Sequence, residues 1–232
     1  EEQAGLLAHR GALDLPDQLG TFSGGGYKVA QGQHGAVLSS GRIQGGRDKM
    51  TTETIFAGFG GQGILFAGKL LAYLGLYQDK QVSWLPSYGP EMRGGTANVT
   101  VIISDERISS PVLNAFDSAI VLNQQSMDKF EPLVKAGGTL IYDPNGITHH
   151  PTRKDINIYQ IEGARLAAEG GNPKIFNMII LGGFLKVKPI INLDNLEKGL
   201  KKSLPARHHN LIPMNIEAVQ TGMAELKTIH QL

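Results

Sequence analysis

Apolar and polar positions along the chain become regular from about Thr52 onward and predict strands and helices in alternation. Short apolar or β-branched runs have the length and composition of buried strands, and the segments between them repeat their apolar positions with a helical period. Strands are predicted at residues 55–57, 81–85, 98–104, 118–122, 139–142 and 156–161, and helices at 64–76, 126–135, 164–169, 173–186, 192–203 and from Pro213 onward. This alternation predicts an α/β fold: a single doubly wound, largely parallel sheet with helices on both faces and a helical C-terminal region.

The first 49 residues lack this regularity. They are rich in Gly, Ser and Gln and hold no sustained apolar periodicity, so they bury too little apolar surface to offset the entropy of ordering them. We therefore expect residues 1–50 to be a disordered extension and residues 51–232 to be the folded domain. Residues 44–49 can be encoded by a purine-rich stretch that resembles a bacterial ribosome-binding site. This suggests that Met50 is the natural start and that the preceding residues are leader or expression-derived sequence; the alternative is a genuine flexible tail.

Composition excludes several classes of protein. The 232 residues are 41% hydrophobic and 19% charged, and the net charge of +1 creates no broad field for nucleic acid or an anionic membrane. No apolar run approaches the roughly 20 residues that cross a bilayer, and no secretory signal is visible, so a cytoplasmic location is expected. The chain has no cysteine, which excludes the usual iron–sulfur ligands, thiol nucleophiles and Cys-based zinc sites. Redox centres would have to lie on other chains.

A first motif, Gly58-Phe59-Gly60-Gly61-Gln62-Gly63, stands between a predicted strand and a predicted helix. We call residues 58–63 the glycine turn. Its spacing is G-x-G-x-x-G, and a helix N-terminus behind glycines suits an anion. A nicotinamide or flavin site would also need an acidic residue at the end of the second strand, where residues 83–87 offer none. An alternative is that the glycines serve only a tight strand-to-helix crossing.

A second motif occupies residues 86–96, which we call the Arg93 loop. Two prolines and three glycines stiffen it at the carboxyl end of the second predicted strand, where ligands bind in open α/β sheets. The loop displays Ser87, Tyr88, Glu91 and Arg93. Arg93 can hold a phosphate or carboxylate through two hydrogen bonds. The alternative is an ion pair between Arg93 and Glu91 that orders the loop or contacts a neighbouring subunit.

Together, in this order, the two motifs resemble the gamma subunit of 2-oxoacid:ferredoxin (acceptor) oxidoreductases. That group includes pyruvate, 2-oxoglutarate, 2-oxoisovalerate and indolepyruvate enzymes. The resemblance extends over residues 53–226, and the first 49 residues have no counterpart in it. Further matching positions are residues 108–111, Asp117, residues 137–143, residues 172–174, residues 177–178 and residues 181–182.

The resemblance implies one subunit of a hetero-oligomeric enzyme of anaerobic metabolism, inactive alone. Such enzymes decarboxylate a 2-oxoacid on thiamine diphosphate, pass electrons through iron–sulfur clusters to ferredoxin and release an acyl-CoA. Thiamine diphosphate and its Mg²⁺ are implied on a beta-type chain, with alpha-type and cluster-bearing delta-type chains as further partners. This sequence has neither cysteine nor the Gly-Asp-Gly and Asn-Asn pattern that binds thiamine diphosphate through a metal.

In related single-chain pyruvate enzymes, the equivalent domain helps to form the coenzyme A pocket. By similarity, the candidate contacts to CoA or to the active site are Gly58, Gly60, Gly61, Gln62, Gly63, Ser87, Tyr88, Arg93 and Gly94. No catalytic residue and no metal ligand is expected on this chain. Two alternatives remain: a stand-alone nicotinamide- or flavin-binding oxidoreductase, and a purely structural docking subunit.

Overall fold

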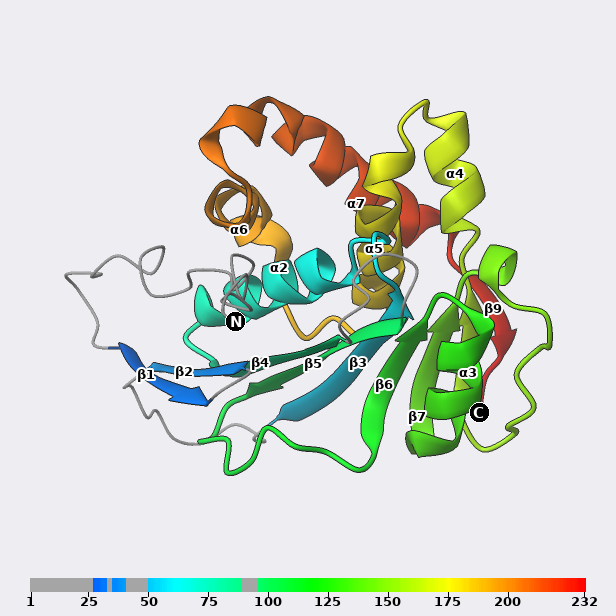
Figure 1. Ribbon diagram of the computed structural model, residues 1–232, viewed down its shortest axis with the longest axis horizontal. Helices are drawn as coiled ribbons and strands as arrows, with labels where there is room; N and C mark the ends of the chain where they lie inside the picture. Colours follow the sequence, from blue (N-terminus) through cyan, green and yellow to red (C-terminus); the bar gives the residue numbers. More distant parts are fainter. Residues whose placement is uncertain (1–26, 33–34, 41–49, 89–95) are drawn as a thin grey trace, which may run out of the picture.

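The computed structural model describes residues 27–32, 35–40, 50–88 and 96–232 (Figure 1). Its strands are β1 Tyr27–Gly32, β2 Gly35–Ser40, β3 Thr51–Phe59, β4 Gln81–Tyr88, β5 Thr96–Ser104, β6 Phe116–Val121, β7 Val134–Tyr142, β8 Asn157–Gln160 and β9 Lys227–His230. Its helices are α2 Ile64–Leu76, α3 Gln124–Phe130, α4 Gly163–Glu169, α5 Phe176–Val187, α6 Leu196–Ser203 and α7 Ile212–Glu225. Short 3₁₀ helices lie at η1 Glu131–Leu133, η2 Pro144–Gly146, η3 Pro173–Ile175, η4 Leu193–Asn195 and η5 Ala206–Leu211.

These strands form one sheet in the order β1-β2-β4-β5-β3-β6-β7-β8-β9. Its centre is parallel, because β3, β6, β7 and β8 pair in parallel. The remaining neighbours, including β5 with both β3 and β4, pair antiparallel. Only seven residues join β4 to β5, too few for the crossover that a parallel pair needs. β4 and β5 are therefore antiparallel neighbours, and β5 lies between β4 and β3. Six of the nine described strands nevertheless run in the same direction.

Two hydrophobic layers cover the two faces of the sheet. On one face, side chains such as Phe56 and Ile120 pack with apolar residues of α2, α5, α6 and α7. On the other face, Ile55 and Ala57 pack with Met127 of α3. Neighbours in β3 thus point to opposite layers, as the two-residue period of a strand requires. The predicted α/β class, helices on both faces and helical C-terminal region are confirmed (Figure 1).

Most predicted elements are present, with informative differences. The helix predicted over residues 126–135 is wrong at its end, since α3 stops at Phe130 and β7 already begins at Val134. Pro132 explains the stop, because proline lacks the amide hydrogen that a continuing helix uses. The pattern gave no sign of β9, nor of β1 and β2, which lie within residues 1–50 and join the sheet beside β4.

The rest of that N-terminal segment, residues 1–26, 33–34 and 41–49, lies outside the described residues. The division of the chain at residue 50 and the leader interpretation stay predictions. Among the helices that the structure describes, none is long and apolar enough to cross a membrane.

Candidate ligand site at the carboxyl edge of the sheet

The glycine turn lies at the point where the sheet reverses its winding. β3 and β6 are parallel neighbours, but the chain leaves β3 for α2 on one face and leaves β6 for α3 on the other. In open α/β sheets this divergence forms a crevice outside the carboxyl ends of the strands, and ligands bind there. The topology therefore places residues 58–63 at the edge that the sequence predicted.

Backbone geometry explains two of the glycines. Gly61 and Gly63 have φ of 102° and 75°, in the left-handed region that glycine adopts without a steric penalty. Gly63 is the N-cap of α2; no side chain caps this helix, and its first turn holds no acidic residue. The first-turn amides of α2, at the positive end of the helix dipole, are thus presented without an internal anion.

Gln62 ties the glycine turn to the end of β6. Its Oε1 accepts a hydrogen bond from the Phe59 amide at 2.6 Å, and its Nε2 donates to the Leu122 carbonyl at 3.4 Å. A Cβ on Gly58 would lie only 2.4 Å from Gln62 Oε1. A Cβ on Gly58 would thus force the folded-back amide of Gln62 to move, and this amide links the turn after β3 to the residue that follows β6.

A second amide holds the turn from the helical layer. Asn177 on α5 is buried, and its Nδ2 donates to the Gly63 carbonyl at 3.1 Å. The same carbonyl accepts from the Ala67 amide at 3.0 Å. A Cβ on Gly63 would lie 2.6 Å from Asn177 Nδ2. Asn177 was not among the predicted site residues, although a polar residue within the apolar run of residues 175–185 was a usable signal.

Buried polar residues also follow the next two strands. Asn123, after β6, accepts the Ser126 amide at the start of α3, while its buried Nδ2 has no hydrogen-bond partner in the described structure. Asp143, after β7, accepts the amides of Asn145 and Ala164, both at 2.8 Å. Burial raises the pKa of the Asp143 carboxyl, against the opposing effect of these hydrogen bonds. Both side chains anchor the turn that follows their strand.

The stem of the Arg93 loop lies at the same edge. Ala97 on β5 pairs with Gly58 on one side and with Tyr88 on the other, so two strand spacings, roughly 10 Å, separate the glycine turn from the end of β4. Ser87 is exposed there. Arg93 and Gly94 lie outside the described residues, so their place at the site remains a prediction, as do the contacts of the other candidates with CoA.

The family model for "Pyruvate ferredoxin/flavodoxin oxidoreductase" matches residues 53–225. The chain belongs to this family. The resemblance seen in the sequence is thereby confirmed, and the matched residues nearly coincide with the region over which it was recognised.

Individual members of the family show which subunit the chain is similar to. The 2-oxoglutarate synthase subunit KorC of Methanocaldococcus jannaschii is 36% identical over 162 residues, covering 68% of this chain and 87% of KorC. The crystal structure of the keto/oxoacid ferredoxin oxidoreductase gamma subunit from Geobacter sulfurreducens matches with a TM-score of 0.65 and 28% identity, covering 76% of this chain and 96% of that one. The expected gamma type is confirmed, and the chain is a subunit of an oxidoreductase.

Another member of the family carries the same unit inside a longer polypeptide. The ketoisovalerate oxidoreductase subunit VorA of Methanothermobacter thermautotrophicus is 32% identical over 169 residues, which cover 72% of this chain but only 34% of VorA. In that relative, about two thirds of the polypeptide therefore lies outside the part that this chain matches.

Proposed function

We propose that this chain is the gamma-type subunit of a thiamine-diphosphate-dependent 2-oxoacid:ferredoxin oxidoreductase, and that its carboxyl edge helps to bind coenzyme A. The assembled enzyme would convert a 2-oxoacid and CoA into an acyl-CoA and CO2 and pass the two electrons to ferredoxin. The partners are alpha- and beta-type chains and, where one exists, a cluster-bearing delta-type chain. A cytoplasmic location stays a prediction from the sequence.

The uncapped N-terminus of α2 behind the glycine turn is the observation that supports CoA binding here. The phosphates of CoA are anions, and first-turn amides that meet no capping side chain suit them. The amides of Gln62 and Asn177 hold the turn from two sides, so a ligand would meet a preformed backbone. Glycine at positions 60 and 61 lets the ligand approach closely.

The division of labour among subunits follows from what this chain lacks. It has no cysteine, so iron–sulfur clusters are assigned to partners. In the part of the chain that the structure describes, no group of three or more His, Asp or Glu side chains could hold a metal ion, and thiamine diphosphate with its Mg²⁺ is assigned to the beta-type chain. What this chain's residues contribute is binding and positioning of CoA, and no catalytic proton transfer is assigned to them.

Two other functions make different use of the same features. A nicotinamide or flavin site needs a carboxylate at the carboxyl end of the strand next to β3. Here that neighbour is the antiparallel β5, which begins at this edge instead of ending there, and the next strand, β4, ends in Ser87 and Tyr88. A purely structural docking subunit is favoured by one observation: Gly58 and Gly63 both have an internal reason to be glycine, in Gln62 and Asn177.

Substitution of Arg93 in the assembled enzyme separates these functions. For Arg93→Ala we expect a raised KM for CoA with assembly intact, and for the control Arg165→Ala, on the exposed surface of α4, an unchanged KM. Unchanged CoA affinity and turnover in Arg93→Ala would contradict CoA binding by this loop. Loss of assembly alone would favour the docking subunit, and stoichiometric NADH or flavin binding by the isolated chain would favour the stand-alone oxidoreductase.

A further inference from the structure

The seam between α2 and α6 holds two lysines over two aromatic rings. Tyr73 and Tyr77, about one turn apart on α2, stack with their ring centroids 6.5 Å apart. Lys69 Nζ, also on α2, lies 5.8 Å from the Tyr73 centroid. Lys198 Nζ, on α6, lies 4.2 Å from the Tyr77 centroid. These four side chains are therefore connected by contacts, and we call them the lysine–tyrosine strip.

A glycine lets the two helices approach closely at the strip. A Cβ on Gly199 of α6 would lie 3.0 Å from Leu70 Cδ1 and from Leu74 Cδ2, so α6 packs tightly against α2. α2 in turn lies between α6 and strands β4 and β5 (Figure 1). Lys198, next to Gly199, is exposed beside this contact, and Lys69 is partly exposed. Packing thus fixes the strip, and both of its lysines can be reached from outside.

The two lysines of the strip have no carboxylate partner within the described part of the chain. There no Asp or Glu forms an ion pair with Lys69 or Lys198, whereas Lys201 of the same helix pairs with Glu197 at 2.6 Å. Burial and the nearby charge of Lys202 lower the pKa of the Lys69 ammonium. An anion supplied from outside would stabilise the charged form of this lysine. A carboxylate would therefore gain more at the strip than at Lys201.

The strip suits an acidic polypeptide better than a phosphate group or a nucleic acid. Its two lysines lie over different rings, so separated carboxylates match them better than one phosphate group does. Both rings already contact a lysine and each other, so they are not presented for stacking with a nucleotide base. The net charge of +1 provides no broad field for nucleic acid. A surface with several Asp and Glu side chains is the matching partner.

The strip lies close to the candidate CoA site. α2 begins behind the glycine turn, and Lys69 follows its N-cap, Gly63, by about 9 Å along the helix axis. The tyrosines continue from there toward the C-terminal end of α2. A chain docked on the strip would lie beside the glycine turn and leave the first turn of α2 accessible.

We propose that the lysine–tyrosine strip is a docking surface for an acidic segment of a partner subunit. This rests on the proposed function as one subunit of a multi-chain oxidoreductase. Carboxylates of the partner pair with Lys69 and Lys198. Because the stacked tyrosines already hold both lysines, little side-chain freedom is lost on binding. The lysine charges also steer association, which makes the contact sensitive to salt.

Removal of both charges tests the proposal against the complex of alpha- and beta-type chains purified without this subunit. For Lys69→Gln with Lys198→Gln we expect the Kd for that complex to rise by about tenfold at low salt. The difference should shrink at about 1 M NaCl, where the Debye length is about 3 Å. The matched control, Lys129→Gln with Lys186→Gln, removes the same charge from exposed lysines elsewhere, one of them over the ring of Phe130. It should bind as the wild type does, and thermal denaturation checks that both variants fold.

Unchanged affinity and salt dependence in the strip variant would overturn the proposal, as would an equal loss in the control. A raised KM for CoA or for ferredoxin with assembly intact would also overturn it, because the strip would then bind that molecule. Loss of self-association alone would assign the strip to a second copy of this chain.

Lysine acetylation read by mass spectrometry gives a second measurement. Lys69 and Lys198 should react less in the complex than in the isolated chain, and Lys129 should react equally in both. Equal reaction of the strip lysines in both states would contradict docking there. The CoA hypothesis fails separately, because Arg93→Ala is read from KM in a complex that still assembles.

Discussion

The side-chain amide of Asn177 donates a hydrogen bond across 3.1 Å to the carbonyl oxygen of Gly63, 114 residues earlier in the chain. This bond attaches α5 to the N-cap of α2, where the glycine turn ends. The position of the ligand-facing turn therefore depends on the helical layer as well as on β3. Because the contact joins distant parts of the chain, its loss should affect binding as well as stability.

Asn177→Ala is expected to destabilise the protein by about 1–3 kcal/mol and to weaken CoA binding, because the N-cap of α2 loses its support. Asn215→Ala is a matched control: Asn215 is also a buried amide, but it donates locally, to the carbonyl of Leu211 at the N-cap of its own helix, at 2.7 Å. Urea denaturation and the KM for CoA in the assembled enzyme check this. An equal rise in KM for both variants would show that stability alone governs the effect.

Gly58 and Gln62 should be energetically coupled. A Cβ at Gly58 lies 2.4 Å from Gln62 Oε1, so Gly58→Ala should displace that amide and leave the Phe59 amide without its acceptor. In a Gln62→Ala background the remaining close neighbour is Leu122 Cβ at 3.1 Å. The same Gly58→Ala change should then cost less, with a coupling of about 1 kcal/mol in a double-mutant cycle. Additive costs would show that Gly58 is glycine for another reason.

Asp143 should make stability fall as the pH rises from about 4. Burial raises the pKa of this carboxyl in the folded protein, so the folded state favours the protonated form. Its contribution is fully present below the ordinary pKa of about 3.9 and is lost as the pH rises through the folded value. Asp143→Asn removes this titration. The unfolding free energy of wild type minus that of the variant should decline over this range, and a constant difference would contradict the assignment.

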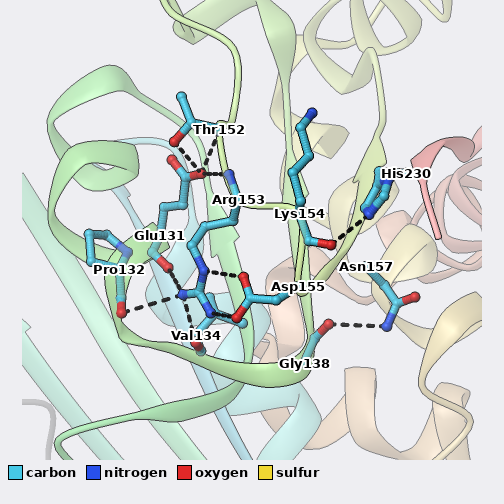
Figure 2. Close-up of polar contacts among 10 residues, drawn as sticks. All are labelled: Glu131, Pro132, Val134, Gly138, Thr152, Arg153, Lys154, Asp155, Asn157 and His230. Atoms are coloured by element: carbon cyan, nitrogen blue, oxygen red, sulfur yellow. Dashed lines mark hydrogen bonds and ion pairs between the residues drawn. The ribbon is translucent and has the colours of Figure 1, made fainter. Parts of the chain in front are cut away.

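Arg153 should matter more for stability than Arg165, a more exposed arginine that has more carboxylate contacts. It donates to the carbonyls of Glu131 and Val134 at 3.1 and 2.9 Å and pairs through two nitrogens with Asp155 (Figure 2). Arg153→Ala removes both bonds, leaves the Glu131 carbonyl with the Val134 amide alone, and is expected to cost about 2 kcal/mol. Arg165→Ala on α4 removes solvent-screened pairs and should cost clearly less. Similar urea midpoints for both variants would refute this.

Much of the fold was visible in the chain because burial leaves a periodic pattern. Residues 64–76 were predicted as a helix and form α2 with the same bounds. The period of the apolar positions, the glycine turn before the helix and the strand after it all indicate these bounds. The end of α3 was predicted wrongly, because the apolar period continued past Pro132 while the missing amide ended the helix. β9 is an edge strand of four residues with little burial, so its pattern carried almost no signal.

By itself the sequence determined the α/β class, the family and the edge of the sheet where the glycine turn lies, because all three depend on local patterns and ordered motifs. Only the tertiary structure decided that β5 separates β3 from β4 and that Gln62 and Asn177 hold the turn. Gly63 and Asn177 are far apart in the chain, and their relative positions follow from packing and strand register.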